Sequence, residues 1–464
     1  MFIGREKELE GLEKLYQTEC FQFPVIYGRR RVGKTALINQ FVQGKEAIYF
    51  TGVESNERQN LENFSKSIWN YTSDADLGSS PIFPSFQAAL EYVFQLAEKK
   101  RLVLVIDEYP YVARASKSLA STLQLLIDRY KDTSKLYLIL CGSSMSFMEN
   151  HVLAYKAPLY GRRTAQFKLQ PFTFLEARKC FKRFSNLDLA IIYGVIGGTP
   201  QYLMQVQDSL SVEENIKTLF LNPNSPLYEE PTNLLKQEVR EPALYNAIIS
   251  AIASGSSRLA EISGKVGEES SVCSAYLKNL ISLGLVRREN PFGDTSSRKT
   301  IYSVEDNMFR FWYRFIPENQ SSISRGVVEV AWKRIEPYLP GFMGPVFEEI
   351  CKQYLWKLLL EGKSPVEFSD LGRWWGTDPR TKKQTEIDIM GASGKEAALF
   401  AECKWTNEKV DLEILKTLEE RGNLFRYPQK QFYLFAKNGF TKGCVEYAEK
   451  LGNVLLVNYE EMLR

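Results

Sequence analysis

The sequence predicts an α/β fold in which an open parallel sheet lies within residues 1–172 and a second α/β domain within residues 333–464. Two observations predict the first sheet. The stretch at 102–106 is apolar at every position, as a central strand covered on both faces requires. Candidate strands also alternate with helical patterns, which is typical of parallel sheets; they are residues 24–27, 47–50, 102–106, 136–140 and 165–169.

The region between the two α/β patterns divides into three parts. Residues 173–238 predict a helical lid that contains a helix-breaking corner at 197–200. Residues 239–316 predict a winged helix, and residues 317–332, which are rich in Ser, Asn and Gln, predict a linker. The expected elements of the winged helix are three helices near 243–253, 257–264 and 270–283, a hairpin from Leu285 to Ser303, and a buried aromatic helix at 308–315.

The composition excludes several classes of protein. The 464 residues are 44% hydrophobic and 25% charged, as in globular proteins of two to four domains. The net charge of +3 favours no general attraction to polyanions. Seven cysteines without a Cys-x-x-Cys pair predict reduced thiols in the cytoplasm and no zinc site. The sequence shows neither a signal core nor a membrane-spanning run, and its single histidine, His151, excludes most histidine-centred catalysis.

A phosphate-binding motif follows the first expected strand. Residues 28–35 read Gly-Arg-Arg-Arg-Val-Gly-Lys-Thr and match G-x-x-x-x-G-K-[ST], with a helical pattern directly after them. The glycines let backbone N–H groups face phosphate oxygens at a helix N-terminus. Lys34 is expected to reach the β- and γ-phosphates of ATP, and Thr35 to ligate Mg²⁺. The predicted nucleotide-binding residues are Gly28, Arg31, Val32, Gly33, Lys34, Thr35, Ala36 and Asp107.

Acidic and small polar residues follow the later strands. Asp107 ends the apolar stretch at 102–106 and is expected to hold the Mg²⁺ shell, while Glu108 is expected to polarise the attacking water. Ser143, after the stretch at 136–140, is a candidate to sense the γ-phosphate or hold that water. Arg162 or Arg163 is either an arginine finger on a neighbouring subunit, which predicts an ATP-dependent homo-oligomer, or part of a solvated basic turn.

These motifs together resemble the prokaryotic archaeal-type ATPases, AAA-like members of the P-loop class related to signal-transduction NTPases. The resemblance covers residues 1 to about 315. It implies a lid and a winged helix after the core, and it places the segment Phe2 to Leu9 against the adenine base. The segments that carry it are 2–9, 28–35, 102–108, 141–144, 158–164 and 197–203.

A second group of charged residues lies near the C-terminus. Asp388 lies in an alternating strand pattern, and Glu402 and Lys404 share one face of the next. A hairpin that joins these residues resembles the D…E-x-K constellation of restriction-endonuclease-like nucleases. Archaeal-type ATPases frequently carry a C-terminal domain of this kind. Asp388, Glu402 and, from the preceding helix, Glu348 would hold Mg²⁺, with Glu349 as the second candidate on that helix, and Lys404 would orient or deprotonate water. The alternative is that these residues form the solvent-exposed polar face of a two-layer domain, which would produce the same E-x-K spacing.

Basic residues of the expected winged helix are candidates for DNA backbone contacts. The alternative is that this region packs against the ATPase core as a nucleotide-responsive lid. We therefore expect an ATPase, with ATP and Mg²⁺ as cofactors, that controls a DNA-directed nuclease domain. The alternative function is a regulatory switch in defence or transcription, whose C-terminal domain binds nucleic acid or a partner without cleavage. The basic candidates are Lys278, Arg287, Arg288, Arg298 and Lys299.

Overall fold

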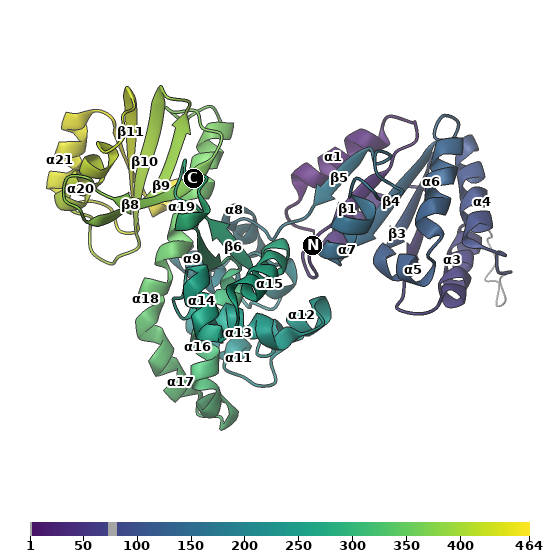
Figure 1. Ribbon diagram of the computed structural model, residues 1–464, viewed down its shortest axis with the longest axis horizontal. Coiled ribbons are helices and arrows are strands. Elements are labelled where there is room, and N and C mark those ends of the chain that lie inside the picture. The colour runs from purple at the N-terminus through teal and green to yellow at the C-terminus, as the bar shows by residue number, and fades with distance from the viewer. Residues whose placement is uncertain (1, 73–80) are drawn as a thin grey trace. The chain divides into compact units, whose positions relative to one another are not determined.

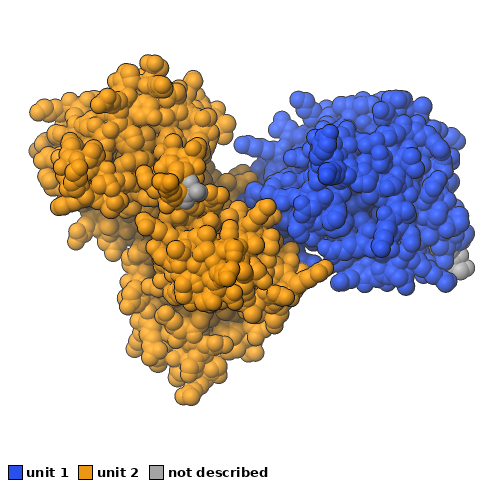
Figure 2. Space-filling model, viewed as in Figure 1, with its two compact units in different colours: residues 1–171, 199–201 blue, residues 172–198, 202–464 orange. Residues whose placement is uncertain are grey.

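The computed structural model describes residues 2–72 and 81–464. It divides into two compact units, one of residues 1–171 and 199–201 and the other of residues 172–198 and 202–464 (Figure 2). The boundary at 171 lies next to the predicted end of the ATPase core at 172. The short segment 199–201 returns to the first unit from within the expected lid.

The first unit is built on a parallel five-stranded sheet in the order β2-β3-β4-β1-β5 (Figure 1). Alternate side chains of its central strands point into two separate hydrophobic cores, which is why these strands are apolar throughout. The strands agree with the predicted stretches: β1 (Pro24–Tyr27), β2 (Ala47–Thr51), β3 (Leu102–Asp107), β4 (Leu136–Gly142) and β5 (Ala165–Lys168).

Helices cover both faces of this sheet. Side chains of α1 and α2 form one core with the sheet, and side chains of α3, α4 and α6 form the other. The helices of the unit are α1 (Glu6–Tyr16), α2 (Lys34–Val42), α3 (Glu57–Thr72), α4 (Phe86–Lys99), α5 (Tyr109–Ala115), α6 (Leu119–Tyr130) and α7 (Met145–Phe147), followed by a π-helix at Met148–Val152.

The second unit begins with helices and one hairpin. The strands β6 and β7 pair antiparallel directly after three helices, at the positions that the sequence predicts. The elements are α8 (Phe174–Ala177), α9 (Asn186–Ile196), α10 (Pro200–Leu203), α11 (Val212–Phe220), α12 (Glu230–Glu238), α13 (Pro242–Ala253), α14 (Leu259–Val266), α15 (Ser270–Ser282), β6 (Val286–Glu289) and β7 (Ile301–Val304).

The expected linker at 317–332 is wrong, because the chain is helical there. Helix α16 (Asn307–Ser324) runs through Pro317, and α17 (Val328–Ile335) and α18 (Leu339–Phe342) follow. The buried side chains of Ile316, Asn319 and Ile323 keep the three- to four-residue spacing of one helix face. This buried face outweighs the hydrogen bond that Pro317 removes, and the polar composition of the other face suggested a linker.

A five-stranded mixed sheet forms the C-terminal part, in the order β12-β11-β10-β9-β8. The pairs β8–β9 and β9–β10 are antiparallel, whereas β10–β11 and β11–β12 are parallel. Side chains of α19 pack on one face and those of α20 and α21 on the other. The elements are α19 (Gly344–Leu360), β8 (Leu371–Thr377), β9 (Gln384–Ser393), β10 (Ala397–Lys404), α20 (Leu412–Gly422), β11 (Gln429–Ala436), α21 (Lys442–Leu451), β12 (Val454–Asn458) and α22 (Tyr459–Met462).

Candidate active sites

The phosphate loop joins β1 to α2, and its two motif glycines are required by geometry. A Cβ on Gly28 would lie 2.5 Å from the carbonyl oxygen of Leu169. Gly33 has a φ of +88°, a left-handed conformation that disfavours other residues, and it caps the N-terminus of α2. The loop therefore ends at a helix N-terminus, where backbone N–H groups can donate hydrogen bonds to a bound anion.

Lys34 and Thr35 lie where the motif predicts them. The Nζ of Lys34 donates hydrogen bonds of 2.9 Å to the carbonyl oxygens of Gly28 and Arg29, and the residue is only 6% exposed. The Oγ1 of Thr35 donates to Oδ2 of Asp107 at 3.1 Å. A hydroxyl beside a buried carboxylate provides hard oxygen ligands of the kind that Mg²⁺ prefers, so this pair fits the metal.

Asp107 is held by further donors. The backbone N–H of Glu108 donates to its Oδ1 at 2.9 Å, and the hydroxyl of Tyr49 donates to its Oδ2 at 2.8 Å. Burial, with Asp107 next to it, raises the pKa of Tyr49 far above its ordinary value, so the hydroxyl remains a donor. Tyr49 could not be predicted from the sequence, because its only signal is a tyrosine in the neighbouring strand β2.

Glu108 and Ser143 form a pair at the same end of the sheet. The Oγ of Ser143 donates to Oε2 of Glu108 at 2.8 Å, and its backbone N–H lies 3.4 Å from the same atom. Glu108 has a φ of +49°, which is uncommon outside glycine and concentrates at functional sites. The two residues come from the ends of β3 and β4, which are neighbours in the sheet.

Two segments that motif spacing could not connect brace the phosphate loop. Arg5, which is 4% exposed, donates to the carbonyl oxygens of Val32, at 2.9 Å, and Gln170. Thr199 accepts a hydrogen bond of 2.5 Å from Nη2 of Arg29, and the backbone N–H of residue 201 lies 3.4 Å from the carbonyl oxygen of residue 31. The only sequence signals were the segments 2–9 and 197–200.

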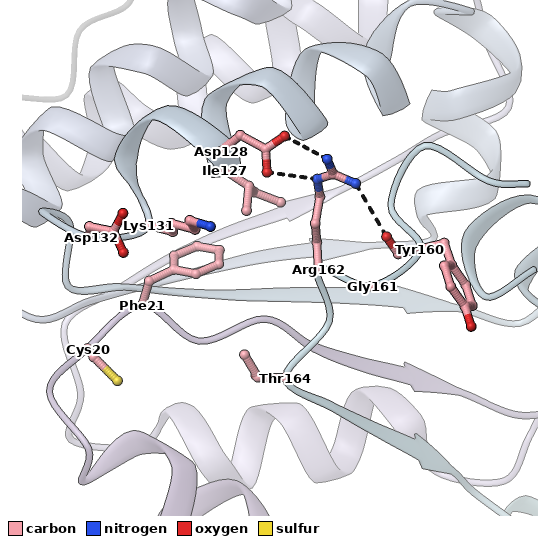
Figure 3. A pocket seen from close by; sticks show the side chains of 10 residues that line it. All are labelled: Cys20, Phe21, Ile127, Asp128, Lys131, Asp132, Tyr160, Gly161, Arg162 and Thr164. Atoms are coloured by element: carbon pink, nitrogen blue, oxygen red, sulfur yellow. Dashed lines mark hydrogen bonds and ion pairs between the residues drawn. The ribbon is translucent and has the colours of Figure 1, made fainter. Parts of the chain in front are cut away.

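Arg162 lies in a pocket at the end of the sheet away from the phosphate loop, and Figure 3 shows its pairing with Asp128 there. It lines a pocket of about 550 Å³ together with Phe21, Asp132 and Thr164, which precede β1, β4 and β5, whereas the phosphate loop follows β1. Its guanidinium pairs with Asp128 at 2.6 and 2.9 Å and donates to the carbonyl oxygens of Pro158 and Tyr160.

Arg163, the second finger candidate, donates to the carbonyl oxygen of Leu153 at 3.3 Å, and its guanidinium lies over the ring of Tyr160. Because Arg162 lies at the far end of the sheet, a finger role for it requires the nucleotide of a second subunit.

In the C-terminal part, Asp388, Glu402 and Lys404 come together on β9 and β10. Asp388 and Glu402 are 6% and 7% exposed, and Oδ2 of Asp388 accepts the backbone N–H of Cys403 at 2.9 Å. The Nζ of Lys404 lies 2.6 Å from Oε1 of Glu402. A third group, the guanidinium of Arg421 on α20, lies 3.1 Å from Oε2 of Glu402 and was not predicted from the sequence.

Electrostatics tie Glu348 to the same cluster. Burial first, and then the charges of Glu402 and Glu348, raise the pKa of Asp388 to about 7. Burial also raises the pKa of Glu348. Burial lowers the pKa of Lys404, but Glu402 and Asp388 outweigh it and leave that pKa above its usual value. Lys404 is thus a cation at neutral pH, which favours orienting water over deprotonating it.

The donor set fits Mg²⁺, which needs only one or two carboxylates plus waters and phosphate oxygens. Asp388 and Glu402 provide two buried carboxylates with a repulsion that a divalent cation would relieve. Among residues 2–72 and 81–464, no group of three or more His, Cys, Asp or Glu side chains is already arranged around a metal position. Glu348 therefore joins the cluster through its charge, not as an assembled third ligand.

The hairpin β6–β7 contacts the C-terminal part of the same unit, so not all of its basic side chains face solvent. Arg287, expected to contact DNA, pairs with Glu289 at 3.1 Å and with Glu349 of α19 at 3.2 Å. The backbone N–H of Phe292 donates to the carbonyl oxygen of Arg373 in β8 at 2.9 Å. Carboxylates of the same unit thus hold Arg287, and its contact with DNA stays a prediction. The other basic candidates are exposed: Lys278, Arg288, Arg298 and Lys299.

Comparison with known proteins finds matches over most of the chain. Residues 2–206 match the family described as an ATPase domain predominantly from Archaea, and residues 312–415 match archaeal and bacterial proteins of unknown function. An uncharacterized protein of Methanocaldococcus jannaschii is 34% identical over 418 residues, which are 90% of each chain. An uncharacterized ATP-binding protein of the same organism is 46% identical over 46 residues, 10% of this chain and 78% of that protein.

Among solved structures, the Walker-type ATPase PABY2304 of Pyrococcus abyssi is similar with a TM-score of 0.51. It is 19% identical, and the alignment covers 68% of this chain and 96% of that one. This likeness shows the fold. In the part of the chain that the structure describes, no helix is long and apolar enough to span a membrane.

Proposed function

Because this chain belongs to the family of the Methanocaldococcus jannaschii protein and is an archaeal-type P-loop ATPase, we propose that its ATP hydrolysis controls a DNA-directed, Mg²⁺-dependent nuclease in its C-terminal part. One observation carries the nuclease proposal: Asp388, Glu402 and Lys404 lie together on two paired strands. Had these three side chains faced different surfaces, the D…E-x-K pattern would have no chemical meaning.

In the proposed ATPase mechanism, each residue acts through the contacts described above. Lys34 would leave the loop carbonyls for the β- and γ-phosphates, and Thr35 and Asp107 would hold Mg²⁺. Glu108 orients the attacking water, and Ser143 fixes the carboxylate of Glu108 for that task. The backbone N–H groups that follow Gly28 cradle the phosphates, with Arg31, Val32 and Ala36 contributing main-chain contacts.

In the proposed nuclease, the chain order is helix, three antiparallel strands, helix and parallel strand, from α19 to β11, and this order supports a restriction-endonuclease-like domain. Asp388 and Glu402 would hold Mg²⁺, which when bound supplies positive charge against the phosphodiester. Lys404 orients the attacking water as a cation. Glu348 adds negative charge that favours a divalent cation in the cluster.

The remaining assignments are also proposals. Helices α13 to α15 with the hairpin support a winged helix, and the exposed Lys278, Arg288, Arg298 and Lys299 support phosphate contacts from its free face. All seven cysteines are free thiols, which supports a cytoplasmic location. Arg162 would act as an arginine finger in an ATP-dependent homo-oligomer, and measuring the mass in solution with and without ATP tests this.

A second function is favoured by the hairpin contact. Phe292 joins the hairpin to β8 beside the acidic cluster, so a movement of the helical region could reach that cluster without any cleavage. In that case the protein is a nucleotide-controlled switch in defence or transcription, and its C-terminal part binds nucleic acid or a partner.

A nuclease assay separates the two functions. The intact protein is incubated with linear and supercoiled DNA in Mg²⁺, with ATP, with ADP and without nucleotide. We expect cleavage that is lost in Lys404→Ala. Lys34→Ala, which has an intact C-terminal cluster, should cleave but lose its response to ATP. Glu396→Gln, in the exposed turn between β9 and β10, is the matched control for a change of charge. Absence of cleavage in every nucleotide condition would favour the switch.

A further inference from the structure

The carboxylate of Glu402 lies between two cations, and the mechanism above uses only one of them. Lys404 reaches Oε1 at 2.6 Å from the same strand, and Arg421 reaches Oε2 at 3.1 Å from the last turn of α20. The side chain of Glu402 is 9% exposed, whereas those of Lys404 and Arg421 are 29% and 24% exposed. Both oxygens of a buried carboxylate are thus occupied, while each cation keeps an edge toward solvent.

We propose that Arg421 is the phosphate-binding residue of the C-terminal site, which pairs with Glu402 until a phosphodiester arrives and then transfers its guanidinium to that phosphate. This inference rests on the proposed nuclease function, because it assumes that Glu402 ligates a metal. It adds a substrate contact that the D…E-x-K pattern does not include.

The positions of the two cations decide which of them moves. Glu402 can offer both oxygens to a divalent cation only after a partner leaves it. Lys404 is two residues away on the same strand face and at 2.6 Å, so the strand itself keeps it beside Glu402. Arg421 is attached to a different element and holds its oxygen at the longer distance of 3.1 Å.

The guanidinium of Arg421 is chemically suited to bind the phosphate of a phosphodiester. Its planar fork of N–H groups binds phosphate oxygens in pairs, which an ammonium cannot do. A phosphodiester carries one negative charge, so Arg421 exchanges one anionic partner for another and is not left buried without a counter-charge. The cluster keeps its charge balance through the exchange.

The backbone under Arg421 is rigid, which a positioned phosphate ligand needs. The next residue, Gly422, packs so closely on the sheet that a Cβ there would lie 2.5 Å from the ring of Phe432. Leu418, one turn earlier, is fully buried. The end of α20 is therefore fixed against β10 and β11, and the guanidinium can move only through its own side-chain rotations.

The test uses the full-length chain and three probes. Mn²⁺ alone is titrated by calorimetry without nucleotide, a short DNA duplex is titrated by fluorescence anisotropy in Ca²⁺, and cleavage is timed in Mg²⁺. The variants are Arg421→Ala and Arg421→Lys. Lys416→Ala, which removes a half-buried lysine that pairs with Glu413 on the same helix, is the matched control. Asp388→Asn identifies which Mn²⁺ binding belongs to this site.

We expect Arg421→Ala to bind Mn²⁺ at least as tightly as the wild type, since a competitor for Glu402 is gone. Its affinity for the duplex should fall about tenfold, the effect of a lost charge-assisted contact, and cleavage should fall further. Arg421→Lys should recover only part of the duplex affinity, because it keeps the charge without the fork. Unchanged ATPase activity and melting temperature would show that the variants are folded.

Two results would overturn the inference. If Arg421→Ala loses Mn²⁺ binding, Arg421 only holds Glu402 in place. If Arg421→Ala matches Lys416→Ala in duplex affinity and cleavage, Arg421 does not touch the phosphate. Failure of the proposed nuclease function would give different results. Asp388→Asn would then leave Mn²⁺ binding unchanged, and the wild type would not cleave DNA. In that case Arg421 would not bind the phosphate of a nuclease substrate either. Weaker duplex binding in Arg421→Ala without any wild-type cleavage would support the contact in a binding domain.

Discussion

Replacing Asp388 by asparagine is expected to stabilise the C-terminal part of the protein while abolishing its metal binding. The pKa of Asp388 rises from 3.8 to about 7 in the folded state, first through burial and then through Glu402 and Glu348. An acid with a raised folded pKa binds its proton more tightly in the folded state than in the unfolded one. Its ionisation therefore reduces stability as the pH increases.

The size and the pH range of this effect follow from the two pKa values. The penalty is absent below pH 3.8, grows as the pH rises and is complete above pH 7. Since one pH unit corresponds to about 1.4 kcal/mol, the ionised carboxylate costs the folded state at most about 4 kcal/mol. Asparagine removes this cost and keeps an oxygen that accepts the backbone N–H of Cys403. The gain should be about 1–4 kcal/mol at pH 8 and clearly smaller at pH 5.

Calorimetric unfolding in EDTA at pH 8 and pH 5 measures this difference, and hydrogen exchange assigns the transition to the C-terminal part. Adding Mg²⁺ at pH 8 should raise the melting temperature of the C-terminal transition in the wild type but not in Asp388→Asn, because only the wild type binds the ion in the C-terminal cluster. Glu396→Gln should change neither. Equal stability of Asp388→Asn and the wild type at both pH values, or a less stable variant at pH 8, would refute the electrostatic reasoning.

Three further outcomes are expected. Lys34→Ala should weaken ATP binding by about 100-fold, through loss of a charge-assisted phosphate contact, and leave Mn²⁺ binding at the C-terminal cluster intact; equal loss at both sites would show misfolding. Ser143→Ala should lower kcat for ATP about tenfold at unchanged ATP affinity, because Glu108 loses its 2.8 Å donor; a change confined to affinity would contradict this. Phe292→Ala keeps the backbone hydrogen bond to Arg373 but removes a partly buried ring that packs beside β8, so it should cost about 1–3 kcal/mol and increase hydrogen exchange in β8; unchanged exchange there would mean that the ring of Phe292 does not hold β8.

Features that depend on residues close in sequence could be predicted. The glycines and Lys34 of the phosphate loop act through a strand, a turn and a helix that are contiguous, so their spacing carries the geometry. The central strands β1, β3 and β4 were found because each is a short apolar run, and a run of this kind indicates burial on both faces. The pair Glu402 and Lys404 was found through the two-residue period of a strand.

Features that depend on contacts between distant segments could not be predicted. Tyr49 reaches Asp107 only because β2 and β3 are neighbours, and nothing in the sequence around Tyr49 marks it. The linker prediction failed because composition was read without the buried spacing that continues through Pro317. The pairing of Arg287 with Glu349 could not be predicted, because 62 residues separate them in the sequence.

The sequence by itself determined that this chain has a phosphate loop on a parallel sheet and a carboxylate–lysine pair on a later strand, since both are set by local spacing and local burial. Only the tertiary structure decided what stands around them: that Arg5 and Thr199 brace the loop, and that Arg421 shares Glu402 with Lys404. The physical reason is that hydrogen bonds and ion pairs act over about 3 Å in space, whatever the separation along the chain.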